Sequence, residues 1–220
     1  MESKDDLNDV WDNYYQKSTR NTILKDDNFF KLEINTIFEQ VKYFTKTKKK
    51  IKILELGSGS GYLASQICSK ILKNITFHYV GIDFSEEAIT KAKKRKIKNC
   101  SFFKNDFLDF LNDSDDVYDI IISQRSVMAI MNKKQQKELL KLIKKHMKQN
   151  SIGIFSEVSQ QAFKKIQTLR KKIHLTPLEK VWHSHYLDES LFSSIFTNKK
   201  LRFSKVKFFC STTQQEPFSL

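Results

Sequence analysis

Apolar residues recur at two different spacings along the chain, and from about residue 50 the two spacings alternate. Short apolar runs, of which Ile51–Leu56 is the first, predict buried strands, whereas apolar residues three and four apart, as in Tyr62–Leu72, predict amphipathic helices. The predicted strands cover residues 51–56, 77–82, 101–103, 118–123, 151–157, 178–185 and 201–210. The predicted helices beyond residue 50 cover 62–72, 85–97, 133–148, 160–173 and 188–196.

This alternation predicts an α/β fold of Rossmann-like, doubly wound type, with a mostly parallel seven-stranded sheet and helices on both faces. The polar start of the chain and a helical stripe from Phe30 to Val41 predict an N-terminal helical arm or lid over residues 1–45. Residues 46–220 are then a single globular domain. Ligands of such sheets bind outside the carboxyl ends of the strands, near the point where the strand order reverses.

Composition narrows the class of protein. The 220 residues are 40% hydrophobic, which excludes wholesale disorder, and no apolar run approaches the ~20 residues of a membrane helix. The N-terminus lacks the pattern of a signal peptide. Cys68, Cys100 and Cys210 are widely spaced and form no ligand cluster. We therefore expect a cytoplasmic protein with unpaired thiols, no metal site and no membrane partner.

The net charge of +14 comes from lysine, because only 5 of the 39 basic residues are arginine. A nucleic-acid-binding protein more often carries arginine, whose planar fork reads phosphates and bases. The lysines fall mostly on predicted helix faces, which favours a solvated surface. An acidic or phosphorylated small substrate is a second explanation of the charge, and nucleic acid is a third. We expect no specific nucleic-acid binding, and the sequence leaves the oligomeric state open.

A glycine-rich turn follows the first predicted strand, in the stretch Glu55-Leu56-Gly57-Ser58-Gly59-Ser60-Gly61. Glycines let the backbone approach a ligand closely, and the free N–H groups of the next helix attract polar ligand groups. Asp83 ends the second strand, where its carboxylate can accept hydrogen bonds from both hydroxyls of a ribose. Asp106 follows the third strand and can accept a hydrogen bond from an adenine amino group, while Phe84 or Phe107 covers the ring.

This pattern resembles the class I S-adenosylmethionine-dependent methyltransferases. Their first motif, an acidic residue, an apolar residue and GxGxG, is matched by Glu55 with Gly57, Gly59 and Gly61. The resemblance implies S-adenosylmethionine as cofactor, with S-adenosylhomocysteine as product, and Glu55 facing the methionine amino group. The cofactor contacts are then Glu55, Gly57, Ser58, Gly59, Gly61, Asp83, Phe84, Asp106, Phe107 and Gln124, with Trp11, Tyr14 and Tyr15 closing over the cofactor.

Two other interpretations of the glycine turn remain open. The stretch Gly59–Ala64 also fits the GxGxxA of nicotinamide and flavin enzymes. Glu55 argues against that class, because its carboxylate would face a pyrophosphate instead of a cationic amino group. The turn could also be a loop without a ligand.

The acceptor is less well defined than the cofactor. The fourth predicted strand ends in Ser123-Gln124-Arg125-Ser126, without the Asn/Asp-Pro-Pro-Tyr of adenine-N6 enzymes, and no Pro-Cys pair is present. Small-molecule O- or N-methylation is left. The second half resembles bacterial small-molecule methyltransferases, some linked to surface-polysaccharide assembly, at Gln124-Arg125, Glu157 and residues 182–189. That resemblance implies a phosphorylated amino alcohol or a nucleotide-linked sugar. An RNA methyltransferase and a catalytically silent cofactor-binding subunit are the alternatives.

Four residues are candidates for catalysis. His183 and His185 could act as general base, because the unperturbed pKa of histidine lies close to working pH, and they would share one face of a strand. Glu157 could anchor an acceptor amine, and Arg125 could hold a phosphate with two hydrogen bonds. Each also has a purely structural interpretation, as do Trp182 and Tyr186, which could wall the same cleft.

Overall fold

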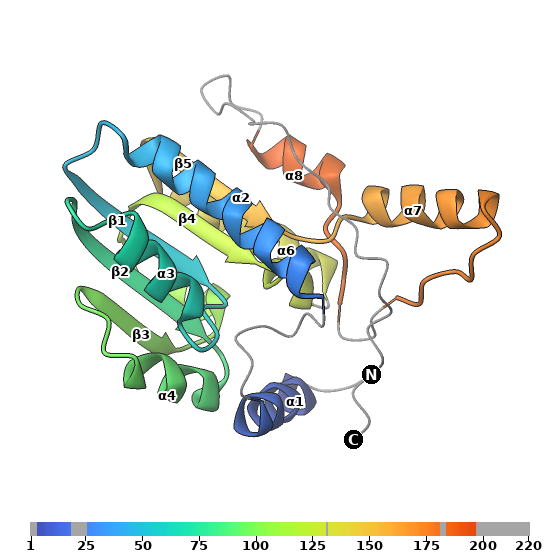
Figure 1. Ribbon diagram of the computed structural model, residues 1–220, viewed down its shortest axis with the longest axis horizontal. Coiled ribbons are helices and arrows are strands. Elements are labelled where there is room, and N and C mark those ends of the chain that lie inside the picture. The colour runs from blue at the N-terminus through green and yellow to red at the C-terminus, as the bar shows by residue number, and fades with distance from the viewer. Residues whose placement is uncertain (1–3, 19–25, 131, 181–183, 197–220) are drawn as a thin grey trace.

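The computed structural model describes residues 4–18, 26–130, 132–180 and 184–196 (Figure 1). Five parallel strands form one sheet in the order β3-β2-β1-β4-β5. The strands are β1 (Lys50–Leu56), β2 (Thr76–Asp83), β3 (Cys100–Lys104), β4 (Tyr118–Gln124) and β5 (Met147–Ser156). The strand order reverses between β1 and β4, so a ligand is expected at the carboxyl ends of these two strands.

The α/β class and the parallel sheet are confirmed, but the prediction of seven strands was wrong for the described residues, which hold five. The predicted strand at 178–185 is absent from its described residues. Its backbone is hydrogen-bonded elsewhere: Leu178 exchanges two bonds with the Gln167 side chain, and the His185 N–H donates to the Met128 carbonyl. Within the described part of the chain, one isolated parallel bridge joins Ser159 to Leu187 outside the five strands. The predicted strand at 201–210 lies outside the described residues.

Helices cover both faces of the sheet (Figure 1). One core cluster joins β1 and β2 to α2 (Asp27–Thr45), α3 (Tyr62–Lys70) and α4 (Glu86–Lys94). The other joins the opposite face to α5 (Phe107–Asn112), α6 (Lys133–Lys145) and α8 (Glu189–Phe196). The short helix η1 (Val127–Ala129) follows β4. Two helices lie outside these layers: α1 (Lys4–Lys17) and α7 (Gln160–Lys172), which buries no residue.

Side-chain caps set where most of these helices begin. A side-chain oxygen accepts backbone N–H groups of the first turn and so satisfies donors that have no partner within the helix. The capping residues are Asp26, Ser85, Asp106, Asn132 and Ser159. The cap of α4 confirms the start predicted from Ser85, whereas α5 and η1 were not predicted.

α2 packs as part of the main core rather than as a loose arm. Ile37 and Val41 are buried against the same cluster as Ile51 and Ile53 of β1. The division of the chain at residue 45 stays a prediction, with α1 as the segment that is separate from the sheet.

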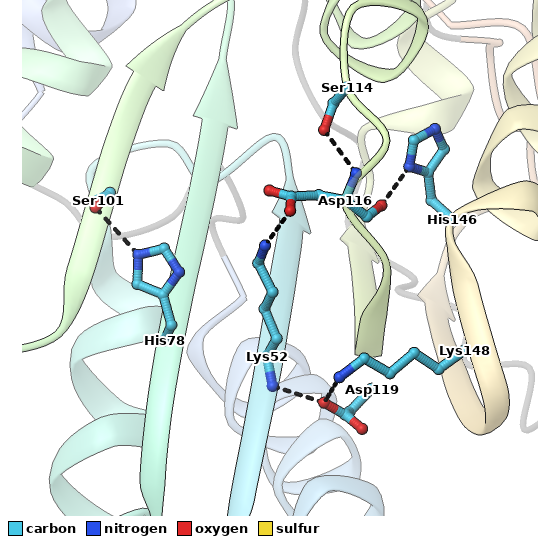
Figure 2. A network of polar contacts seen from close by, with 8 residues as sticks. All are labelled: Lys52, His78, Ser101, Ser114, Asp116, Asp119, His146 and Lys148. Carbon is cyan, nitrogen blue, oxygen red and sulfur yellow. Dashed lines mark hydrogen bonds and ion pairs between the residues drawn. The ribbon is translucent and has the colours of Figure 1, made fainter.

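A polar network ties the amino ends of three strands together, at the edge opposite the expected site (Figure 2). Lys52 of β1 pairs with Asp116 at 2.6 Å, and its N–H donates to Asp119 of β4. Lys148 of β5 pairs with the same Asp119 carboxylate at 2.7 Å. The ring of His146 contacts the carbonyl of Asp116, so this buried histidine is part of the scaffold.

Candidate active site

The glycine turn between β1 and α3 is shaped for close approach. Gly57, Gly59 and Gly61 all have positive φ, at 74°, 49° and 70°, where a side chain would be strained. A Cβ on Gly57 would lie 1.9 Å from the Ser126 hydroxyl. The N–H groups of Gly57 and Ser58 donate to the carbonyl of Ile82, so β2 fixes the turn.

Asp83 at the end of β2 connects the glycine turn to the next helix. One carboxylate oxygen accepts from the Gly59 N–H at 2.9 Å and the other from the Ser85 N–H at 3.0 Å. Burial raises the pKa of Asp83 to about 6, opposed by these backbone hydrogen bonds. The group is therefore a buried, mostly ionised acceptor at neutral pH.

A pocket opens between the glycine turn, the end of β2 and the end of β4. Its wall comprises Trp11, Tyr15, Phe30, Gly57, Ser58, Gly59, Ser60, Tyr62, Leu63, Asp83, Phe84, Phe107, Gln124, Arg125, Ser126 and Ala129. Of the ten predicted cofactor contacts that follow α1 in the sequence, seven lie in this wall: Gly57, Ser58, Gly59, Asp83, Phe84, Phe107 and Gln124.

The wall fits an adenosyl group. Asp83 offers a ribose acceptor, and the rings of Phe84 and Phe107 offer apolar faces for a base. The Ser58 hydroxyl is buried in the wall without a hydrogen-bond partner among the described residues. A buried polar group of this kind is costly unless a ligand or water pairs with it. These features agree with a ligand that carries hydroxyls, amines and a flat ring.

The first helix closes over the pocket. The Tyr15 hydroxyl would lie 2.4 Å from a Cβ on Gly59, so this ring rests on the glycine turn. Burial raises the pKa of Tyr15 well above its usual value. The open volume beneath is about 100 Å³, whereas ligand pockets usually span roughly 300–1,000 Å³. The described position of α1 therefore leaves too little room for a whole cofactor.

Polar contacts hold α1 on the start of α4. Lys91 donates to the carbonyls of Tyr15 and Ser18, the latter at 2.9 Å. Asp12 accepts from the Ser85 hydroxyl and from the Glu87 N–H. Trp11 and Tyr15 enter the pocket wall, while Tyr14 packs edge-on against both rings. Placing α1 here agrees with the predicted lid, and its closing over bound cofactor stays a prediction.

Four predicted cofactor residues do not line the pocket: Tyr14 of α1, and Glu55, Asp106 and Gly61. The Glu55 carboxylate is 2% exposed and accepts from the Tyr79 hydroxyl at 2.8 Å, behind the glycine turn. Burial raises the pKa of Glu55 to about 8. Asp106 caps α5 through the N–H groups of Leu108 and Asp109. Gly61 packs against Ala92 and Phe102. Contacts of these residues with the cofactor stay predictions.

The end of β4 presents Gln124 and Arg125, which belong to the predicted acceptor rim. Both contact Glu33 of α2: its Oε2 accepts from the Gln124 amide at 2.7 Å and lies 3.4 Å from an Arg125 nitrogen. Glu33 Oε1 accepts from the Ser156 hydroxyl at 2.6 Å. Arg125 has φ 58°, and its side chain is 13% exposed in the pocket wall. The buried Glu33 carboxylate thus forms an ion pair with Arg125 that helps to position its guanidinium.

Sequence reasoning missed Glu33, although a signal was present. Position 33 lies three residues after Phe30 and four before Ile37, so it falls on the apolar stripe of α2. A charged residue at such a position is rarely buried without a partner. Its partners come from β4 and β5, which only the folded chain brings together.

Glu157 supports the turn after β4 rather than facing the pocket. Its carboxylate accepts from the Ser123 hydroxyl at 2.5 Å and from the N–H groups of Ser126, Val127 and Met128, each at 3.1 Å. Burial raises the pKa of Glu157, and these four donors oppose the shift. The contacts assign Glu157 to positioning the β4–η1 turn, and its use as an amine anchor stays a prediction without a contact to support it.

Neither candidate histidine is found among the described residues of the pocket wall. His183, with Trp182, lies outside the described residues. His185 does not line the pocket. Its backbone N–H donates to the Met128 carbonyl, and the Nε2 atom of its ring has no hydrogen-bond partner among the described residues. Burial, with the charges of Lys180 and Lys133, lowers the pKa of His185. Tyr186 is buried against Phe163. A base role for either histidine stays a prediction.

Known proteins are similar to this chain in sequence and in fold. A family model described as a methyltransferase domain matches residues 47–207. The chain belongs to the class I S-adenosylmethionine-dependent methyltransferases. The N-terminal segment that carries α1 and α2 lies before the matched range.

Curated relatives of this methyltransferase chain include malonyl-[acyl-carrier protein] O-methyltransferases. That of Bacillus anthracis is 33% identical over 119 residues, 54% of this chain and 41% of the relative. That of Bacillus cytotoxicus is 31% identical over 152 residues, 69% of this chain and 49% of the relative. The chain thus spans less than half the length of these relatives.

Solved structures share the fold at low sequence identity. The N-methyltransferase NodS from Bradyrhizobium japonicum, in complex with S-adenosylhomocysteine, has a TM-score of 0.62 at 13% identity. The match covers 85% of this chain and 83% of the NodS chain. The DhpI–SAM–HEP complex has a TM-score of 0.60 at 11% identity, with 90% of each chain covered. No helix among the described residues is long and apolar enough to cross a membrane.

Proposed function

We propose that this methyltransferase transfers the methyl group of S-adenosylmethionine to a carboxylate oxygen of a small or carrier-bound acid. The observation that carries the proposal is Arg125 in the pocket wall, at the end of β4 and next to Gln124. An arginine guanidinium matches the planar geometry of a carboxylate, which it can bind with two parallel hydrogen bonds. The O-methyltransferases among the relatives act on a malonyl group, which agrees with an acidic acceptor.

The lack of a base in the wall supports a carboxylate over an alcohol. Among the residues that the structure describes, the wall contains no histidine, and its one carboxylate is Asp83 on the ribose side. An alcohol must lose a proton during transfer and benefits from a positioned base. A carboxylate is already ionised at neutral pH, so the protein needs only to align it with the methyl group and exclude water.

The residues divide the work accordingly. Bound S-adenosylmethionine would supply an electrophilic methyl group on its sulfonium. Asp83 would hold the ribose, and the glycine turn would follow the methionine portion. Arg125 would orient the acceptor, while Glu33, itself hydrogen-bonded by Gln124, positions the guanidinium. Tyr15 and Trp11 would keep water out.

Transfer of a tritiated methyl group to a panel of acceptors tests this function. The panel contains a malonyl thioester, free dicarboxylic acids, phosphoethanolamine and total RNA. We expect label in an acid, released as volatile methanol by mild alkali because the product is a methyl ester. Alkali-stable label in phosphoethanolamine or RNA would contradict the carboxylate assignment, and no transfer to any acceptor despite cofactor binding would favour a silent subunit.

Variants at Arg125 separate acceptor binding from cofactor binding. Arg125→Ala should raise the KM for the acid about 10- to 100-fold, as expected for a lost charged hydrogen bond, and leave cofactor affinity nearly unchanged. Arg125→Lys should restore part of the loss. Lys94→Ala, an exposed lysine on α4, is the matched control for a lost positive charge.

A further inference from the structure

Two of the three cysteines meet inside the fold, away from the pocket. Cys68 lies in α3 and Cys100 begins β3, and their sulfur atoms are 3.5 Å apart. Cys68 is 8% exposed, whereas Cys100 is half-buried. Neither residue lines the cofactor pocket. Their separation of 32 positions hides this contact in the sequence.

The environment makes the two thiols unequal. The hydrogen bond from Cys68 lowers the pKa of Cys100. The same hydrogen bond, together with burial, raises the pKa of Cys68. A thiolate is the reactive form of cysteine, and reactivity also needs access to solvent. Cys100 has the lowered pKa and the greater exposure of the two, and the Cys68 thiol is in contact with it.

We propose that Cys68 and Cys100 form an oxidation site, where hydrogen peroxide converts the two thiols into a disulfide that links α3 to β3. The Cys100 sulfur attacks one peroxide oxygen; an S–O bond forms, the O–O bond breaks, and the departing hydroxide takes up the Cys100 proton as water. The Cys68 sulfur then attacks the sulfenic sulfur; the S–S bond forms, the S–O bond breaks, and the second hydroxide takes up the Cys68 proton. Two thiols and one peroxide give one disulfide and two waters.

The position of the pair makes the small closing movement feasible. A disulfide needs sulfur atoms about 2.05 Å apart, so the present distance must shorten by roughly 1.5 Å. Cys68 lies in the last turn of α3, and Cys100 is the first residue of β3, so both can shift at an element end. The link would enclose β2 and α4, which carry Asp83 and the contacts of α1. This inference does not depend on the acceptor.

Oxidation of the full chain carrying Cys210→Ser tests the site. After stoichiometric hydrogen peroxide we expect a mass loss of about 2 Da, the disappearance of both alkylatable thiols and a cross-linked peptide pair containing Cys68 and Cys100. Closing a loop of this length should raise the thermal midpoint by roughly 5–10 °C, and dithiothreitol should reverse the shift. Persistence of both thiols, or oxidation of Cys100 to the sulfinic acid without a cross-link, would overturn the proposal.

Single variants test the order of attack. Cys68→Ser should leave Cys100 as a sulfenic acid that dimedone traps, because the resolving thiol is gone. Cys100→Ser should leave Cys68 unreacted at the same peroxide dose. Dimedone trapping at Cys68 in the Cys100→Ser chain would overturn the assignment of Cys100 as the attacking thiol. The measurement on the chain that carries only Cys210→Ser decides the proposal even if a further variant fails to fold.

Discussion

Buried carboxylates surround the pocket, and each is held by a different set of donors. Asp83 accepts from two backbone N–H groups, Glu157 from three and a hydroxyl, and Glu33 from an amide, a hydroxyl and a guanidinium. Glu55 has a phenol as its partner. Burial raises the pKa of Asp83, Glu157 and Glu55 because it penalises the charged form, and the hydrogen bonds that each accepts oppose the shift.

Asp83 should control cofactor affinity in a pH-dependent way. Asp83→Ala should weaken S-adenosylhomocysteine binding about 10- to 150-fold, because two ribose hydroxyls lose a buried acceptor. In the parent chain affinity should fall as the pH drops through about 6, where this carboxyl takes up a proton. Titration calorimetry at pH 7.5 and 5.5 measures both effects.

Asp83→Asn gives the control for that experiment. It keeps the size of the side chain and has no proton to gain, so its affinity should be low and nearly constant with pH. Unchanged affinity in Asp83→Ala would refute the ribose assignment, and tight binding of NADH by the parent chain would favour a dinucleotide enzyme.

Glu55 should make folding stability fall as the pH rises. The pKa of Glu55 is about 8 in the folded chain and 4.5 for an unperturbed glutamate, so between these pH values the folded state binds more protons than the unfolded state. The free energy of unfolding therefore decreases across this window. Glu55→Gln should remove this decrease, on the order of 2–4 kcal/mol between pH 5 and 9.

Urea unfolding at pH 5, 7 and 9 measures the effect of Glu55. The Tyr79→Phe variant is informative beside it, because the lost hydrogen bond stabilises the ionised carboxyl and its removal should steepen the fall. Equal pH dependence in Glu55→Gln and the parent chain would show that Glu55 is not the titrating group.

At the scale of elements, the contacts of Lys91 and Ser85 with α1, which we call the clasp, hold α1 against α4 beside the pocket. Lys91→Ala removes two hydrogen bonds from α4 to the carbonyls that end α1. We expect S-adenosylhomocysteine to dissociate roughly 3- to 10-fold faster, as for one or two lost hydrogen bonds. Stopped-flow fluorescence of Trp11, which lies in the pocket wall, reports the rate.

Lys93→Ala is the matched control for the clasp, because Lys93 is an exposed lysine on the same helix. Its dissociation rate should equal that of the parent chain. Tyr15→Ala should act in the same direction as Lys91→Ala, since the ring rests on the glycine turn. A slower or unchanged rate in both Lys91→Ala and Tyr15→Ala would contradict a lid function for α1.

At the scale of the whole molecule, the charge of +14 should produce only weak attraction to nucleic acid. The lysines are spread over several helices, and the one arginine of the pocket wall is paired with Glu33. RNA affinity should fall by orders of magnitude between 50 and 200 mM salt, as release of counterions requires. Filter binding with two unrelated RNAs measures this, and nanomolar, sequence-dependent binding near 150 mM salt would contradict it.

The sequence by itself determined the five strands of the parallel sheet, the glycine turn and the cofactor class, because these follow from local patterns. Alternating periods specified these strands and most of the helices between them, though not α5, and positive φ at three alternate positions favours the glycines that the sequence shows. Asp83 was predictable because a strand end in a parallel sheet faces the ligand whatever the details of packing.

Only the tertiary structure decided which polar groups meet. Glu33 reaches Arg125 across 92 positions, and Cys68 reaches Cys100 across 32, because crossover helices bring distant strand ends together. Glu157 and Glu55 were predicted to contact ligands, and in the structure both accept hydrogen bonds from protein donors. A buried carboxylate is normally hydrogen-bonded within the protein, and the sequence does not show which donors it meets. The segment at 178–185 had the composition of a strand, but the backbone of Leu178 is bonded to the Gln167 side chain of α7 and that of His185 to Met128 of η1. Pairing of this kind depends on the partners that folding supplies, and no local pattern records them.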